Sequence, residues 1–190
     1  MRSNLDYKIV KSKRKTCAIQ IYPNSKIIVR TPLSMTNKEI ESFVNSKRDW
    51  IEKSLKKYET SNTEFSNLKA LSKEDIYNLK QKAKQIIPSK VDFYASKMGV
   101  SYNKITIKCQ KSRWGSCSSK SNLNFNCLLM LTPNDVIDYI IVHELCHLKE
   151  MNHSKQFWNE VKTVLPEYEK SHKWLKENGN TIIQNALENI

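Results

Sequence analysis

The stretch "VHELCHLKEMNH", residues 142–153, determines which fold we expect, because it holds three of the four histidines in this chain of 190 residues. His143 and His147 are four residues apart. On an α-helix they would lie about 40° apart around the axis and about 6 Å apart along it, so both imidazoles can reach one metal ion. Glu144 follows the first histidine. This H-E-x-x-H spacing is typical of sites in which two histidines bind Zn²⁺ and the glutamate is a general base.

A catalytic zinc needs three protein ligands and one open position, and His153 is the obvious third ligand. In a continued helix, His153 would lie about 9 Å beyond His147 along the axis, out of reach. The helix must therefore end near Leu148, and the chain must turn back. Asn152 tolerates the left-handed conformation that such a turn can use. Ser154 is placed to cap the next helix.

The expected cofactor is thus Zn²⁺, with His143, His147 and His153 as ligands and Glu144 as the catalytic base. Other ligand sets stay open. A glutamate could replace His153, and a closed structural site would need a fourth Cys or His. The residues concerned are Glu150, Glu160, Glu167, Cys117 and Cys146. We interpret Tyr168, His172 and the pair Arg113–Trp114 as packing or surface residues rather than as members of the site.

Charge is distributed unevenly in the chain, whose formal net charge is +13. Residues 1–60 carry 14 basic and 6 acidic side chains, and residues 61–120 carry 12 and 4. Residues 121–190 carry 6 basic and 9 acidic side chains. The basic residues of 1–120 would attract anionic partners, DNA or RNA first among them. A solvated, lysine-rich surface is the alternative explanation.

Composition also bears on the compartment. No apolar run approaches 18 residues, so we expect no transmembrane helix, and the N-terminus lacks the apolar segment of a signal peptide. Five cysteines without a C-x-x-C motif favour free thiols in a reducing cytoplasm. The sequence does not indicate an oligomeric state.

Periodicity predicts mixed α and β structure. Residues 16–30 alternate as a hairpin with a turn at "PNSK" (23–26), and a helix with a Thr36–Glu39 capping box follows, apolar at helical spacing through Leu55. A second helix begins at Ser72, is kinked or split by Pro88 and stops at Gly99.

The following segment supplies the expected sheet. "KITIKCQ" (104–110) and "LNFNCLLML" (123–131) alternate as strands around a polar loop, 111–122, and the second strand is a candidate edge on which an extended substrate adds. The histidine-bearing helix comes next. We therefore predict an α+β fold in which this helix packs on a small mixed sheet, preceded by an N-terminal β-hairpin plus helix. The expected domain boundaries are an N-terminal part at 1–59, a linker at 60–72, a metal-binding domain at 73–180 and a C-terminal tail at 181–190.

Three segments resemble the YgjP-like metallopeptidase family, a relative of the SprT-like and minigluzincin groups. They are "SRWGSCSSKSNLNFN" (112–126), "LTPNDVIDYIIVHELCHLKEMNHSKQFW" (131–158) and, more weakly, "IIVRTPLSMTNKEIESFVNSKRDWI" (27–51). The resemblance covers nearly the whole chain. It implies a zincin-like fold, the same three histidines as zinc ligands and Glu144 as catalytic base. It implies no particular substrate, although SprT-like relatives act on proteins crosslinked to DNA.

Two other families share the histidine spacing. The metzincin motif has Gly at the position of Glu150 and is followed by a Met-turn, for which this chain has no matching signature. The spacing also resembles a bacterial rRNA-maturation endoribonuclease family, whose second motif position is not glutamate, so Glu144 favours a peptidase.

We therefore expect a zinc-dependent metallopeptidase that hydrolyses peptide bonds with a Glu144-activated, zinc-bound water. Its substrate would be a peptide or protein, with nucleic-acid-associated proteins as a candidate class. The alternatives are a metal-dependent endoribonuclease and a nucleic-acid-binding module with a structural zinc.

Overall fold

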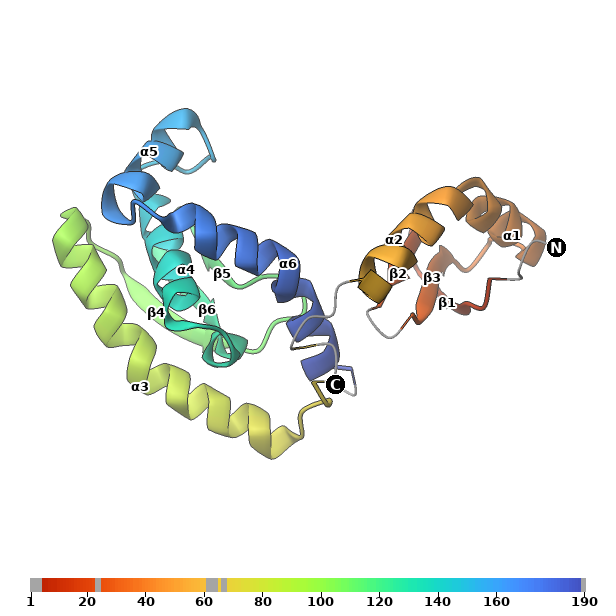
Figure 1. Cartoon of the computed structure of the whole chain (residues 1–190), viewed down its shortest axis with the longest axis horizontal. Coiled ribbons are helices and arrows are strands. Elements are labelled where there is room, and N and C mark those ends of the chain that lie inside the picture. Colours follow the sequence, from red (N-terminus) through yellow and green to blue (C-terminus); the bar gives the residue numbers. More distant parts are fainter. Residues whose placement is uncertain (1–4, 23–24, 61–64, 66–67, 189–190) are drawn as a thin grey trace. The chain divides into compact units, whose positions relative to one another are not determined.

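The computed structural model describes residues 5–22, 25–60, 65 and 68–188. The chain divides into two compact units, Met1–Asn67 and Leu68–Ile190, each with its own hydrophobic core (Figure 1). The predicted turn residues Pro23 and Asn24 and most of the predicted linker lie outside the described residues.

The first unit has three strands and two helices. Strands β1 (Lys8–Ser12), β2 (Ala18–Ile21) and β3 (Ile27–Pro32) form a sheet in the order β1-β3-β2. β3 runs antiparallel to β2, which confirms the hairpin, and parallel to β1, which we had not predicted. The burial of β3 alternates along the strand, so that one face of the sheet covers the core.

Helices α1 (Asn37–Ser46) and α2 (Arg48–Thr60) cover this sheet, where we expected one continuous helix. The predicted capping box is present: Thr36 Oγ1 accepts from the Glu39 N–H, and the Glu39 carboxylate accepts from the Thr36 N–H. The backbone breaks at Lys47, so Trp50, which we placed on the apolar face, is 51% exposed.

The second unit opens with helix α3 (Lys73–Met98). Ser72 and Asp75 form a second capping box at its start, and Gly99 ends it with a φ of 64°, in the left-handed region that glycine adopts without strain. Pro88 lies inside this single helix and does not split it, contrary to one of our two expectations.

The sheet of the second unit contains β4 (Lys104–Lys108), β5 (Gly115–Cys117) and β6 (Asn122–Asn126) in the order β4-β6-β5. The predicted polar loop 111–122 thus contains a strand. The predicted strand 123–131 ends at Asn126, and Cys127–Leu131 form the 3₁₀ helix η1. β6 is the central strand, so its edges are already paired, and it cannot be the edge strand that we expected. The edge beside the histidine-bearing helix belongs to β5.

Helix α4 (Asn134–Cys146) is the centre of this unit, with nine of its thirteen residues buried. It contacts α3, β5, α5 (Lys155–Val164) and α6 (Tyr168–Ala186), and Figure 1 shows α3 and α6 on either side of it. The predicted packing of the histidine-bearing helix on a small mixed sheet is therefore confirmed.

The C-terminal residues differ from the expected tail at 181–190. Helix α6 continues to Ala186 and buries Ile182, Ile183, Ala186 and Leu187. These apolar side chains recur at helical spacing, a signal that also marks a core helix. Among the described residues, no helix combines the length and the apolar character that crossing a bilayer requires.

Candidate metal centre

The turn after α4 brings the third histidine back to the first two. α4 ends at Cys146, with His147 at its C-cap, and the N–H groups of Lys149 and Glu150 both donate to the Cys146 carbonyl. Asn152 does not take the left-handed conformation that we expected. Its side-chain oxygen instead accepts from the Ser154 N–H at 3.1 Å, which fixes the turn locally.

The three predicted histidines meet at one point. One ring nitrogen from each of His143, His147 and His153 lies within 4.8 Å of the other two. The Nε2 atoms of His143 and His153 are 3.0 Å apart. Two ligands of a tetrahedral zinc with bonds of about 2.0–2.1 Å would lie about 3.3 Å apart, so this pair already has nearly the separation that one ion requires.

The other ring nitrogens decide which atoms face the common point. His147 Nδ1 lies 3.1 Å from the Glu150 carbonyl oxygen, and by donating to it leaves Nε2 as the lone-pair nitrogen. His143 Nδ1 is buried and finds no hydrogen-bond partner among the described residues. Burial lowers the pKa of His143 to about 3, with further contributions from the neighbouring histidines, and burial also lowers the pKa of His147. Neutral imidazoles are the form that binds a metal.

Phe157 holds this cluster from below. It is fully buried in α5, and its ring centroid lies 4.9, 4.6 and 4.8 Å from those of His143, His147 and His153. Trp158, the next residue, stacks on His153 at 5.8 Å. Ser154 starts α5 by accepting from the Phe157 N–H, so the same cap that ends the turn positions this ring.

Glu144 lies on the same cavity, which is about 240 Å³ in volume and is also lined by β5 and Met151. Only 5% of Glu144 is exposed. Burial raises the pKa of its carboxyl group to about 8, opposed by a hydrogen bond from the Cys117 backbone and by the charge of Arg113. The carboxyl group is therefore held against β5 by a main-chain donor, beside the histidines.

The donor set fits a metal. Among the described residues, these three histidines are the only group of three or more Cys, His, Asp or Glu side chains that converge closely enough to share one ion. Glu160 is paired with Lys149 and Glu167 with Lys170, so neither is a third ligand here. Cys117 lines the cavity and Cys146 is buried, but neither thiol joins the group. Three neutral nitrogen donors without a fourth protein ligand are typical of an open, catalytic site.

The other residues weighed from the sequence lie around this centre. Tyr168 and His172 stack on Trp158 at 5.5 and 5.6 Å, so both belong to an aromatic layer next to His153. The Trp114 indole lies against Gly179 of α6, as expected for a packing residue.

Two residues of the site escaped the sequence analysis. Gly115 makes room for Glu144, since a Cβ at this position would lie 2.6 Å from Oε1 of the carboxylate. Phe157 was visible only as one more apolar position of an amphipathic helix. A glycine between Trp114 and Ser116, in a loop expected to be polar, was the one available signal.

Comparison with known proteins gives two solved structures of interest. The metallopeptidase zymogen abylysin of Pyrococcus abyssi is 19% identical and aligns over 54% of this chain and 99% of its own, with a TM-score of 0.45. The metallopeptidase zymogen jannalysin of Methanocaldococcus jannaschii is 25% identical and aligns over 48% of this chain and 95% of its own, with a TM-score of 0.44. No curated protein matches the chain.

The family comparison is broader. The model of the "YgjP-like, metallopeptidase domain" family matches residues 15–78 and 66–178, well over half of the sequence. Both structural TM-scores lie below 0.5, so the assignment rests on this match. The chain belongs to the YgjP-like metallopeptidase family and is a metal-dependent hydrolase.

Proposed function

We propose that this chain is a zinc peptidase whose ion is held by His143, His147 and His153 and whose general base is Glu144. The observation that carries the proposal is the convergence of three imidazoles on one cavity that also holds a buried carboxyl group. All four residues belong to the unit Leu68–Ile190, to which we assign the catalytic activity.

A zinc ion bound there would supply Lewis acidity, which polarises a carbonyl group and acidifies a water molecule. The chain's own residues do the rest. Glu144 accepts a proton from the attacking water and passes it to the leaving amine. The Cys117 N–H fixes the carboxyl group in place. Phe157 and the buried face of α4 exclude solvent from the inner side of the histidines.

The first test compares the wild-type chain with His153→Ala by elemental analysis, beside His172→Ala as a matched control. His172 is exposed and outside the convergent group, so its loss should leave about one zinc per chain. His153→Ala should lose or weaken zinc binding. Equal zinc in all three proteins would refute the ligand assignment.

Glu144→Gln separates binding from chemistry. We expect the variant to keep its zinc and to lose cleavage of unfolded protein substrates by about 100-fold or more, because the amide cannot accept a proton. A variant with full activity would show that another group is the base. The experiment also distinguishes a structural zinc, since a binding module would not respond to this substitution.

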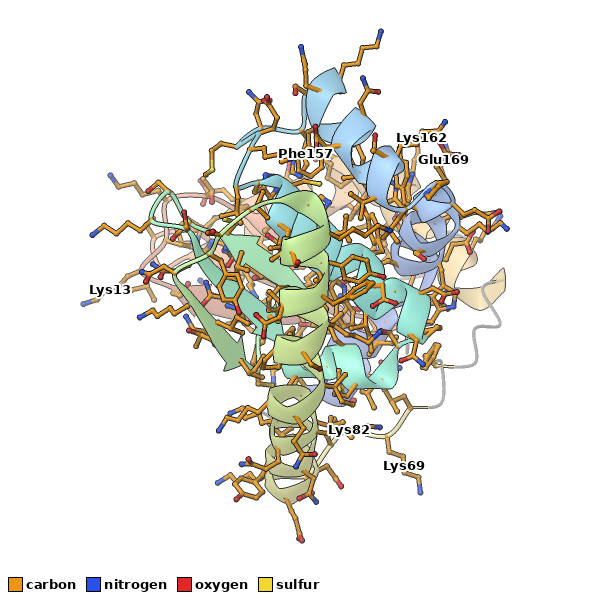
Figure 2. The ribbon with its side chains drawn as sticks, turned by 90° about the vertical axis from the view of Figure 1, so that its left-hand side faces the viewer. Lys13, Lys69, Lys82, Phe157, Lys162 and Glu169 are labelled. Atoms are coloured by element: carbon orange, nitrogen blue, oxygen red, sulfur yellow. The ribbon has the colours of Figure 1, made fainter. Side chains whose placement is uncertain are left out.

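For the substrate, we propose proteins associated with nucleic acid. The support is the charge of the chain, +13 in total, carried by residues 1–120. Lysines such as Lys13, Lys69 and Lys82 extend from the surface (Figure 2). Cleavage of a DNA-bound protein should then exceed cleavage of the same protein alone and should fall with salt. Cleavage of RNA by the zinc-loaded wild type but not by Glu144→Gln would favour the endoribonuclease alternative instead.

We also propose a reducing compartment, the cytoplasm, as the location. All five cysteines are free thiols in the structure. Free, partly accessible thiols persist where glutathione and thioredoxin keep them reduced. Cell fractionation would test this.

A further inference from the structure

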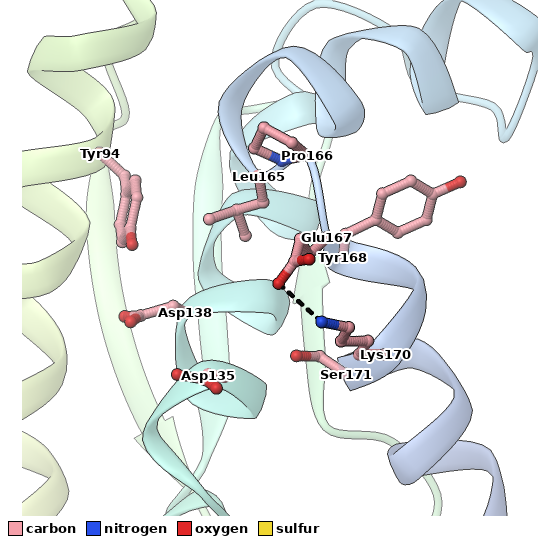
Figure 3. Close-up of a pocket in the computed structure, with 9 residues that line it drawn as sticks. All are labelled: Tyr94, Asp135, Asp138, Leu165, Pro166, Glu167, Tyr168, Lys170 and Ser171. Carbon is pink, nitrogen blue, oxygen red and sulfur yellow. Dashed lines mark hydrogen bonds and ion pairs between the residues drawn. The ribbon is translucent and has the colours of Figure 1, made fainter.

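A second cavity, of about 370 Å³, lies between α3, α4 and the start of α6. Figure 3 shows its polar side chains converging from three elements: Tyr94 from α3, Asp135 and Asp138 from α4, and residues 165–171 from the corner between α5 and α6. Three carboxylates line it, against one lysine, Lys170. The cavity is therefore acidic in a chain that is basic as a whole.

Ser171 supplies an unused hydrogen-bonding group in this cavity. The residue is only 8% exposed, and its hydroxyl is directed toward the cavity in Figure 3. It makes no hydrogen bond within the part of the chain that the structure describes. A buried hydroxyl without a partner is unfavourable by about 1–3 kcal/mol. A ligand in the cavity would supply the missing partner.

The carboxylates are not equally available. Asp138 is bound by Lys90 at 2.7 Å and by the Tyr94 hydroxyl, so its charge is already compensated. Asp135 makes no hydrogen bond or ion pair to any described residue. Glu167 pairs with Lys170 at 2.9 Å, but the side chains of both are about three-quarters exposed, and such pairs contribute little. Asp135 and Glu167 are thus open to an incoming cation.

The spacing of these groups selects the kind of cation. The carboxylates of this cavity do not converge closely enough to share one ion, since the only such group among the described residues is the histidine cluster. Leu165, Pro166 and the rings of Tyr94 and Tyr168 supply apolar wall beside the carboxylates. An ammonium or guanidinium group on an alkyl stem matches both features, because the stem packs on apolar wall while the head meets the carboxylates. The ammonium of Lys170, which reaches Glu167, shows that the mouth of the cavity accommodates such a head.

One aromatic ring separates this cavity from the metal centre. Tyr139 of α4 lies 5.8 Å from His143 on one side and stacks at 6.2 Å on Tyr168, which lines the cavity. The rings of His143 and Tyr168 are therefore no more than about 12 Å apart, a distance that about four residues of extended peptide span.

We propose that this cavity binds the basic side chain, lysine or arginine, of a peptide substrate, within about four residues of the bond cleaved at the histidine cluster. The link to cleavage rests on the proposed peptidase function. The binding of a cationic side chain does not, so the two are tested separately.

The binding test uses the zinc-loaded full chain and two probes of matched shape, N-acetyl-lysine amide and N-acetyl-norleucine amide, titrated by NMR. The lysine probe should bind at least about fivefold more tightly, the factor that corresponds to one ion pair of about 1 kcal/mol. Its chemical-shift changes should centre on Tyr168 and Ser171. Equal binding of the two probes would overturn the proposal.

Four variants assign the site. Asp135→Asn and Glu167→Gln should each weaken binding of the lysine probe about three- to fivefold, and Ser171→Ala should weaken it with little effect on folding. Lys170→Gln should strengthen binding, because it removes the competing ammonium. The matched control is Glu169→Gln, an exposed residue of the same helix that does not line the cavity and lies on the outer surface (Figure 2). A loss in the control as large as in Glu167→Gln would reduce the effect to bulk charge and refute the site.

The cleavage test then compares peptides that differ only in lysine or norleucine near the scissile bond. A preference for lysine that is lost in Asp135→Asn, with Glu169→Gln unchanged, supports the substrate role. If the lysine probe binds but no peptide is cleaved, the peptidase function fails and the cation site stands. If peptides are cleaved without any lysine preference, the peptidase stands and the substrate role of the cavity fails.

Discussion

Gly115 of β5 lies so close to the carboxyl group of Glu144 that a Cβ atom at position 115 would stand 2.6 Å from Oε1 and 2.7 Å from Cγ. The contact is to the stem and the head of a side chain that is itself 95% buried, so Glu144 could not simply rotate away. β5 thus fixes the proposed base in two ways, through the missing side chain of Gly115 and through the N–H of Cys117.

Gly115→Ala should therefore move the Glu144 carboxyl group while leaving the three histidines in place. A displacement of about 1 Å at a catalytic group lowers activity by about 100-fold. We expect a loss of that size in kcat/KM, with zinc content unchanged by elemental analysis.

Gly99→Ala is the matched glycine control. A Cβ there would meet nothing within 4 Å, but Gly99 has a φ of 64°, so the substitution should cost about 1 kcal/mol of stability without affecting activity. An active Gly115→Ala enzyme would mean that Glu144 is not held where the chemistry occurs.

Phe157→Leu should weaken zinc binding. The ring touches all three histidines, and groups that orient metal ligands typically change metal affinity by about 10- to 100-fold. We expect at least about a tenfold rise in the Kd for zinc, measured by competition with a chromophoric chelator.

Val161→Ala controls for the general effect of a core substitution in α5. Val161 is fully buried one turn further along the helix, and neither substitution should cost more than about 3 kcal/mol of stability. If both variants lose zinc affinity equally, the role of Phe157 is only to stabilise the fold.

Removal of zinc should lower the melting temperature but leave the fold intact. The unit Leu68–Ile190 has a continuous apolar core that includes α3, α4 and α6, so the three histidines close a site on a fold that forms without them. Zinc at 1,000 times its Kd would add about 4 kcal/mol of stability. Far-UV circular dichroism before and after chelation, with a thermal scan of each, measures both effects.

The variant His153→Ala should have the melting temperature of the chelated protein and should not respond to chelator. A complete loss of helical signal on chelation would instead indicate a structural zinc, which is the binding-module alternative.

Much of the fold was predictable because its signals are local. Thr36–Glu39 and Ser72–Asp75 are side chains that bond within three residues, and both boxes start the helices that they predict. Strand β5 was missed because three residues in a polar stretch carry no period, and its pairing with β6 is a tertiary contact. The break at Lys47 was missed for a similar reason, since the apolar spacing runs through it.

The histidine cluster was predictable from spacing, since four residues on a helix place two rings on one face. The position of His153 required only that the chain turn back, and the structure brings it there, although through the side chain of Asn152 and not a left-handed residue. Gly115 and Phe157 could not be assigned, because a close approach and a ring cluster arise only when distant segments meet. The acidic cavity was hidden for the same reason.

Asn126 connects the sheet to the site, and its substitution should disturb both. The side chain is fully buried, donates to the carbonyl groups of Gln110 and Arg113 at 2.8 and 3.0 Å, and accepts from the Leu128 N–H at 3.2 Å. It therefore shapes the loop that enters β5 at Gly115. Asn126→Ala leaves these main-chain groups without partners, and we expect a loss of at least about 2 kcal/mol in the free energy of unfolding.

Because the loop leads into β5, Asn126→Ala should also lower kcat more than it raises KM, as Glu144 loses its fixed support. Asn124→Ala is the control from the same strand: its side chain makes one hydrogen bond, to Ser116 Oγ at 3.3 Å, and should cost no more than about 1 kcal/mol. Denaturant unfolding and steady-state kinetics on both variants decide the matter. Equal effects at 124 and 126 would show that the loop is held by the sheet as a whole, and that Asn126 has no particular part in placing β5 against Glu144.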